Sequence, residues 1–591
     1  MTIPGGNLTT PRSSFDKRSA FVLAYRTSAR LNLAAGKFMN TTVHVWGAAL
    51  LLSLACWGVG SALVTSRRPI VGMLCGWCCF LLLCTIPWIA GFSAHAMRPL
   101  FWAFFTAGMV VIIHGRRWPE LICAILCTGA VSALLCAPYL LYPGVLAYGA
   151  HGTDMWGYVC TSEWLYGHSL RNLPDVGNAP MRFNWVWYVL HTRERPLIYE
   201  SLACLGSASG LTPVQAYITY PAVLLASVAM AVCREQRVFG LKHWTLALLP
   251  AIALVIHPLI ILHWIAGFFS GSIVGPYTAL AFAAVAVVEE GRARTEVLAL
   301  ALLMMVFCAG LYSGQFLLVG LIVAGVPAMV TSLVILWRKG WRSLLGARPG
   351  WLASAVLSAA SVLTVATLAL SGDEFVGSAG GHPELSRKVM GEFLGIFGAS
   401  SPYSWLMYRP LEPRDLDPLH NPVGCAALIV MAILFGLFSW RRWQTSRDIQ
   451  VPLLVGVCVG CLWQVGGDTG IMAKLMPIFG FALLPMLATV SGELRPWRLG
   501  LAAAVVCCMS SVRSGEEIWS MVHGPYITIS AENRFNLGDG DSWRVMAYLH
   551  FWEDTEGLDW TKRPKTYFAL TCYLPEQFRQ RLAQKYHLPP P

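Results

Sequence analysis

The sequence predicts an all-α polytopic membrane protein with about 13–14 transmembrane helices. Two observations lead to this class. The chain of 591 residues is 56% hydrophobic and only 13% charged, and its apolar residues gather in repeated runs. Each run approaches the roughly 20 residues that a helix needs to cross the hydrocarbon core of a bilayer. The expected surroundings of the chain are therefore a lipid bilayer.

The apolar runs form two groups, separated by a long polar interval at 151–214. A basic segment, 1–40, precedes them, and its stretch 21–38 is typical of a basic amphipathic helix lying on a membrane surface. The first group is a front module of four runs within 41–150, and ten runs follow within 215–513. The predicted spans are 41–64, 70–92, 99–114, 119–142, 215–233, 244–266, 270–288, 295–311, 315–337, 351–370, 422–440, 450–466, 474–492 and 499–513.

The net charge of +12 comes mostly from Lys and Arg in short loops between the spans. Basic loops stay on the cytoplasmic side, so a membrane accounts for this charge and nucleic acid is excluded as the expected partner. The long polar segments 151–214, 371–421 and 514–591 then face outward, which suits a bacterial inner membrane. The basic segment 1–40 also falls outside in this arrangement. Either one early span does not cross, or the segment is tolerated outside, or translation starts at Met39.

The polar tail 514–591 predicts a small α+β appendage on the outer face. Tyr567–Leu574 is rich in aromatic residues and Thr and favours a strand. Pro575 then opens a helix that runs to Lys585, because proline suits the first turn of a helix. A further helix is expected over Asp541–Trp552.

The polar interval begins with Asp154, directly after a predicted membrane exit and at the expected start of a short amphipathic helix. A carboxylate at the boundary between membrane and water suits a general base. The same position also suits a helix N-cap, where Asp accepts amide hydrogen bonds and favours the helix dipole. Both roles remain open at this point.

The interval resembles the first outer loop of the GT-C glycosyltransferases, such as the dolichyl-phosphate-mannose-protein mannosyltransferases and the lipid A aminoarabinose transferases. An acid after a span, an aromatic-rich helix that ends at Gly, a Pro-Leu-Tyr-like stretch and Gly-Leu-Thr/Ser-Pro form the pattern. The matching residues here are Asp154, Tyr158, Trp164, Gly167, Arg195-Pro196-Leu197-Ile198-Tyr199 and Gly210-Leu211-Thr212-Pro213. The family usually has a second acid beside the first, where this chain has Met155, and one preceding span rather than four. The resemblance implies a polyprenyl-phosphate-linked sugar donor and an extracytoplasmic acceptor.

Sugar transfer from such a carrier needs positive charge to hold the leaving phosphate, and Lys474, Arg195 and Arg409 are the candidates. Headgroup anchoring or surface ion pairing would explain these three residues equally well. Tyr158, Glu163, Glu200 and His257 are the candidate substrate-binding residues. The aromatic stretch 181–188 favours an interfacial belt over a sugar-stacking platform.

No metal site is predicted from the 18 Cys, because several fall inside apolar spans and the spacing lacks a zinc signature. The acids of loop 371–421 either hold a divalent cation or simply face solvent. Two rival classes remain: a transporter or flippase, which also builds multi-span bundles, and a non-catalytic membrane subunit. An enzyme would hold Asp154 at the rim of an outward cavity with a basic residue nearby, whereas a transporter would hold its acids near the midplane.

Overall fold

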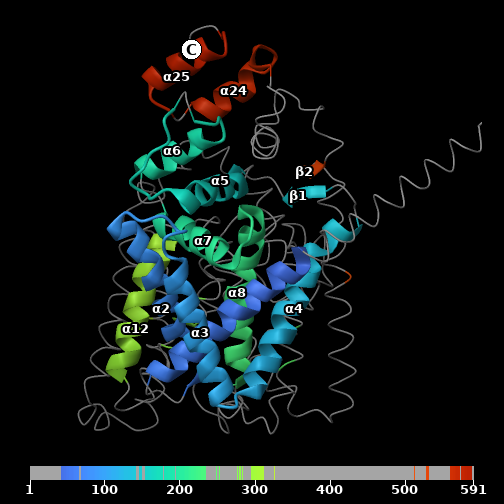
Figure 1. Cartoon of the computed structure of the whole chain (residues 1–591), viewed down its shortest axis with the longest axis vertical. Helices are drawn as coiled ribbons and strands as arrows, with labels where there is room; N and C mark the ends of the chain where they lie inside the picture. The colour runs from blue at the N-terminus through green and yellow to red at the C-terminus, as the bar shows by residue number, and fades with distance from the viewer. Residues whose placement is uncertain are drawn as a thin grey trace, which may run out of the picture.

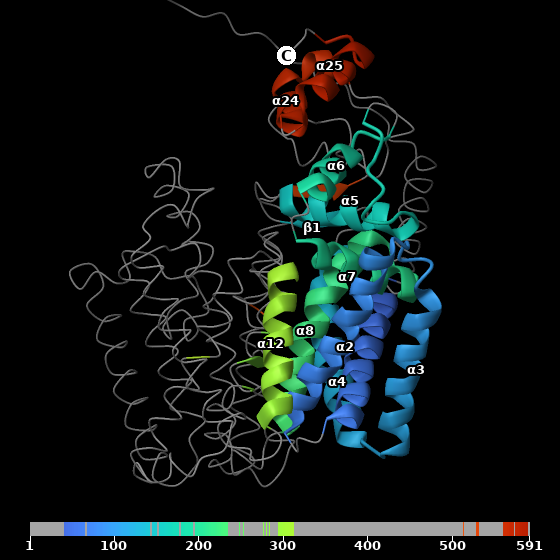
Figure 2. The same cartoon turned by 90° about the vertical axis from the view of Figure 1, so that its left-hand side faces the viewer.

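The computed structural model describes ten stretches of the chain, together with isolated positions between 248 and 512. The stretches are 41–64, 68–141, 145–149, 153–176, 179–192, 195–234, 294–311, 527–530, 559–572 and 574–588. This part of the protein is helical apart from one pair of short strands. Figures 1 and 2 show a bundle of long helices with shorter helices across one end. Eight of the predicted spans, from 244–266 onward with the exception of 295–311, lie outside the described stretches.

Six helices run lengthwise through the described bundle (Figures 1 and 2), and their bounds follow the apolar runs of the sequence. They are the first helix Thr41–Leu63, α2 (Pro69–Ala90), α3 (Arg98–His114), α4 (Trp118–Leu141), α8 (Pro213–Arg234) and α12 (Arg294–Leu311). Three of the described helices are long and apolar enough to cross a membrane: Thr41–Leu63, α2 and the Trp118–Ala137 part of α4. The expected class, a helical membrane protein, is confirmed at this level.

Glycines bring the first helix into backbone contact with its neighbours. A Cβ on Gly60 would overlap the carbonyl oxygen of Gly72 in α2, and a Cβ on Gly58 would overlap that of Gly108 in α3. Small residues at such contacts let helix backbones approach closely, which is how helices gain packing energy where lipid surrounds them. The front module is therefore a tightly packed unit.

The four helices of the front module pass the full length of the bundle in alternating directions. The Gln215 side chain at the start of α8 donates to Thr41 Oγ1 over 3.4 Å, so the first helix begins at the end where α8 begins. The turn between α2 and α3 returns to this end, because the backbone N–H of Ala94 donates to Leu165 in α5 over 3.0 Å. The turn at Arg116-Arg117 lies at the opposite end, between α3 and α4.

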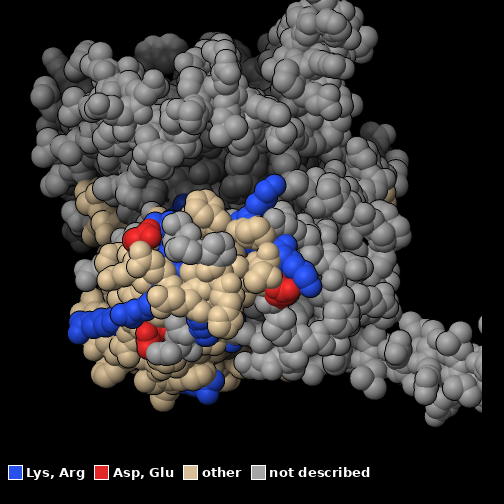
Figure 3. All heavy atoms as spheres, turned by 90° about the horizontal axis from the view of Figure 1, so that it is seen from above, with Lys and Arg blue, Asp and Glu red and all other residues tan. Residues whose placement is uncertain are grey.

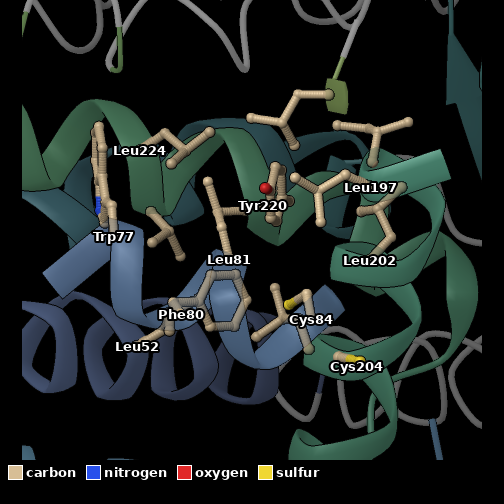
Figure 4. Packing of buried hydrophobic residues seen from close by; sticks show 14 of the residues in the cluster. Leu52, Trp77, Phe80, Leu81, Cys84, Leu197, Leu202, Cys204, Tyr220 and Leu224 are labelled. Atoms are coloured by element: carbon tan, nitrogen blue, oxygen red, sulfur yellow. The ribbon is translucent and has the colours of Figure 1, made fainter. Parts of the chain in front are cut away.

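Three shorter helices lie across the end where α8 begins: α5 (Thr153–Gly167), α6 (Phe183–Thr192) and α7 (Pro196–Ser209). Helix α7 sits directly on the bundle, and its residues from Leu197 to Ala208 are all buried. Figure 4 shows Cys204 of α7 beside Cys84 of α2, with Tyr220 of α8 close by. The polar interval is therefore a layer of packed helices rather than an irregular loop.

The tail returns to this same end. Its strand β2 (Ile527–Ser530) pairs antiparallel with β1 (Val145–Gly149), just before α5. Its helices α24 (Pro564–Thr571) and α25 (Glu576–Lys585) stand above α6 in Figure 1. The ring of Phe578 in α25 meets Trp187 of α6 at 5.1 Å, edge to face. These segments of the tail therefore pack near the Asp154 region, and loop 371–421 lies outside the described residues.

The strand predicted over Tyr567–Leu574 is wrong, because most of this stretch belongs to helix α24. Its buried residues Tyr567, Thr571 and Leu574 recur every three to four positions, which is the period of a helix and not of a strand. Tyr567 packs against Trp560 at 5.9 Å between ring centroids, which fixes that face. The helix predicted after Pro575 is confirmed as α25, and the one over 541–552 lies outside the described residues.

Candidate functional site

Asp154 lies in the first turn of α5, which begins at Thr153, so the helix start expected from the sequence is confirmed. The helix follows α4 and β1 at the end of the bundle. One helical turn later, on the same face of α5, comes Tyr158. The candidate base therefore lies at the end of the bundle, on helix α5, which directly follows strand β1.

Tyr158 joins the two halves of the family-like pattern. Its side chain is buried, with 2% exposed, and its hydroxyl oxygen accepts a hydrogen bond from Arg195 Nη1 over 2.7 Å. Its ring packs against Tyr199 at 5.3 Å and Tyr217 at 6.2 Å between centroids. Arg195, expected from the sequence as a phosphate ligand, is thereby bonded to the residue that follows Asp154 by one turn of α5.

Arg195 has an uncommon backbone conformation. Its φ of 50° and ψ of 44° place it in the left-handed region, where residues other than Gly are seldom found. It is the cap residue of α7, and Pro196 follows at the first helical position. Such strained positions persist when surrounding contacts hold them, and they gather at functional sites. The contact with Tyr158 is one such restraint.

Glu200 and Glu163 differ in their surroundings. The Glu200 side chain is 1% exposed, and neither carboxylate oxygen has a hydrogen-bond partner among the described residues. Burial raises the pKa of Glu200 to about 8, so this carboxyl group is mostly protonated and uncharged at neutral pH. Glu163 instead forms an ion pair with Arg182 over 3.2 Å, at the partly exposed side of α5. The burial of Glu200 and the ion pair of Glu163 were not evident from the sequence.

A pocket of about 440 Å³ opens beside this cluster. Its walls come from four segments: the end of α2, the α5–α6 connection, α6 and the start of α7. The residues that define it are Trp88, Ile89, Arg171, His191, Pro196 and Tyr199. Tyr199 contacts Tyr158 as well, so the pocket and the Arg195–Tyr158 pair share one wall. Arg171 was not predicted from the sequence, and Tyr199 was named only as part of the GT-C-like pattern, because the pocket forms only where four segments meet.

The turn between α2 and α3 secures α7 in place. Ser207 Oγ lies 2.7 Å from His95 Nδ1, and Arg98 Nε donates to the Ser207 carbonyl over 2.8 Å. Desolvation and the nearby Arg98 charge lower the pKa of His95, which favours the neutral ring that Ser207 Oγ–H can donate to. This network fixes the far end of α7 and with it the position of Arg195 at the near end.

Several expected site residues cannot be placed by this geometry. Lys474, Arg409 and His257 lie outside the described residues. Within the described stretches, no group of three or more His, Cys, Asp or Glu side chains could hold a metal ion. Figure 3 views the end of the molecule that carries the tail helices, where Lys and Arg project around a mostly uncharged described surface.

The chain has no match among known family models, curated proteins or solved structures. The fold and the site geometry are therefore the grounds for a functional proposal.

Proposed function

We propose that this chain is an integral membrane glycosyltransferase of the GT-C type, which moves a sugar from a polyprenyl-phosphate carrier to an extracytoplasmic acceptor. The observation that carries the proposal is the hydrogen bond between Arg195 and Tyr158. It joins the two separated parts of the GT-C-like pattern, because Tyr158 lies one helical turn after Asp154 on α5 and is hydrogen-bonded to Arg195 at the start of α7. The transfer requires a base for the acceptor hydroxyl and a cation for the leaving phosphate, and Asp154 and Arg195 are the candidates.

The proposed chemistry uses Asp154 as the general base. Its carboxylate takes the proton of an acceptor hydroxyl, and the hydroxyl oxygen bonds to the anomeric carbon of the sugar. The bond between that carbon and the phosphate oxygen breaks, and the polyprenyl phosphate leaves with the electron pair. Arg195 would stabilise the departing phosphate, because a guanidinium forms strong charge-assisted hydrogen bonds to phosphate oxygens.

The position of α5 favours an enzyme over a transporter. This helix lies across the end of the bundle in Figures 1 and 2, whereas transport sites lie near the middle of the spans. The Arg116-Arg117 turn lies at the other end of the same bundle, and basic loops favour the cytoplasmic side. We therefore propose that α5–α7 face outward from a multi-pass protein of a bacterial inner membrane.

Replacing Asp154 tests the mechanism. Asp154→Asn keeps the size and capping ability of the residue but removes the base, since Asn caps helices about as well as Asp. The variant should insert normally and lose roughly 100- to 10,000-fold in rate. The assay incubates purified protein with polyprenyl-phosphate-linked hexoses and pentoses and acceptor-bearing membrane extract. Mass spectrometry then measures the polyprenyl phosphate released, a product that every sugar donor shares.

Asp154→Ala is the matched variant that separates base from cap. It should lose the same activity and also about 1 kcal/mol of stability if the residue caps α5. A residue that only caps would give an active Asn variant and an Ala variant impaired through low abundance. Near-normal turnover per folded Asp154→Asn molecule would end the catalytic proposal.

A further inference from the structure

The pocket between α2, α6 and α7 contains none of the proposed transfer residues Asp154, Tyr158 and Arg195. Its volume of about 440 Å³ falls within the range of small-molecule sites, which is roughly 300–1,000 Å³. It also lies where the apolar helix α2 ends and the layer of shorter helices begins. The boundary between hydrocarbon and water is expected at this level.

The charges around the pocket favour an anion. Among the described lining residues, Arg171 and His191 carry basic side chains and none is acidic. The first residue of α7, Pro196, also lines the pocket, so the positive end of that helix dipole adds to the basic field. The ligand chemistry that these groups recognise best is a phosphate.

Arg171 is held in a geometry that suits phosphate binding. Its Nη2 donates to the backbone carbonyl of Ile89, and its side chain lies against Gly91, 3.4 Å from where a Cβ would be. Gly91 ends α2 with a φ of 78°. A guanidinium has five N–H donors, and the bond to Ile89 engages one of its nitrogens. Among the described residues, the Ile89 carbonyl is the acceptor to which the guanidinium of the exposed Arg171 donates.

An apolar stripe leads from the bilayer to the mouth of the pocket. Leu82 and Ile89 on α2 are 52% and 67% exposed, and they are seven residues apart on one helix face. Trp88 is 37% exposed beside them and lines the pocket, as an interfacial Trp would. A ligand with its phosphate at Arg171 can therefore keep its hydrocarbon chains against α2.

We propose that this pocket binds the headgroup of an anionic phospholipid, with the phosphate at Arg171 and His191 and the acyl chains along the Leu82–Ile89 stripe. The proposal does not rest on glycosyl transfer, since the site and its ligand are the same whatever reaction occurs at Asp154. In this proposal α2 of the front module holds a lipid that also contacts α6 and α7.

The test measures lipid binding to the full-length protein purified in detergent. Dioleoylphosphatidylglycerol is titrated and the bound lipid is counted by native mass spectrometry, with dioleoylphosphatidylcholine as the zwitterionic comparison. Arg171→Gln keeps a donor for the Ile89 carbonyl but removes the charge. It should weaken phosphatidylglycerol binding roughly tenfold to a hundredfold, the value of a charge-assisted hydrogen bond. Leu173→Trp, which fills the pocket from its exposed edge, should abolish the bound lipid.

Two matched variants control for general effects. Arg182→Gln removes an arginine between α5 and α6 that pairs with Glu163 outside the pocket, and Leu302→Trp enlarges an exposed residue of α12. Both should bind phosphatidylglycerol as the unchanged protein does. Equal binding by Arg171→Gln and the unchanged protein would overturn the proposal. Displacement of the lipid by inorganic phosphate at equal affinity would do the same, because the occupant would then be a soluble phosphate compound.

Discussion

The buried Glu200 makes the stability of this protein depend on pH, and replacing it with Gln should remove that dependence. Its side chain is 1% exposed in α7, and its two oxygens have no hydrogen-bond partner among the described residues. Burial raises the pKa of this carboxyl group to about 8 from its ordinary value of 4.5. The folded protein therefore holds this proton more tightly than the unfolded chain does. The stabilisation is fully present below about pH 4.5 and is lost as pH rises through 8.

The magnitude follows from the shift. A difference of 8 − 4.5 = 3.5 pKa units, at about 1.4 kcal/mol per unit, is on the order of 5 kcal/mol between the two ends of this window. In Glu200→Gln the side chain has the same shape and stays neutral at every pH. The variant should match the unchanged protein near pH 5 and exceed it at pH 8 and above.

The assay is the midpoint of thermal unfolding of the purified protein in detergent, measured from pH 5 to 9 at one scan rate. Glu163→Gln is the matched control, since this acid pairs with Arg182 on the partly exposed side of α5. Its loss should leave the decline between pH 5 and 8 in place. If Glu200→Gln declines with pH as steeply as the unchanged protein, the buried carboxyl group does not hold the proton and the reasoning is refuted.

Two further predictions concern packing. Gly60→Ala should destabilise the front module by about 1–3 kcal/mol, because its Cβ would overlap the Gly72 carbonyl. Gly47→Ala on the same helix has nothing within 4 Å of the new Cβ and should be neutral or slightly stabilising; equal thermal midpoints for the two variants would contradict the close approach of the helices. Phe578→Ala should loosen the tail from α6 by removing the edge-to-face contact with Trp187, so limited proteolysis should cut the tail faster. The exposed Phe568→Ala is its control, and equal cleavage of the two would argue against docking through Phe578.

The helices of the front module could be predicted because each is a continuous apolar run, and α2 to α4 also have a proline and an arginine near their starts. Pro69 and Arg98 open α2 and α3 within a residue of the predicted bounds. The start of α5 at Thr153 was predictable for a related reason, since the polarity changes sharply there after α4. Length and polarity are local properties, so one sequence is enough to detect them.

The missed features depend on residues far apart in the chain. Strands β1 and β2 have five and four residues and lie at opposite ends of the sequence, too short for any alternation to identify them. The α24 segment contains Tyr, Phe and Thr, which favour strands, but packing on Trp560 imposed the helical period. The pocket could not be predicted from the sequence, because Ile89 and Arg171 come together only in the folded chain.

The alternating directions of the four front helices matter for the side of the membrane on which Asp154 was expected to lie. The first helix begins beside Gln215, at the end where α5–α7 lie, and the next three helices alternate in direction. Three of the four are long and apolar enough to cross a membrane, and α3 is shorter. The described turn at the far end carries Arg116 and Arg117, while the turn at the near end places His95 and Arg98 against α7 instead. At the near end His95 and Arg98 hold α7, whereas Arg116 and Arg117 at the far end lie where basic loop residues of a membrane protein commonly gather. The outward orientation proposed for α5–α7 rests on this contrast between the two turns.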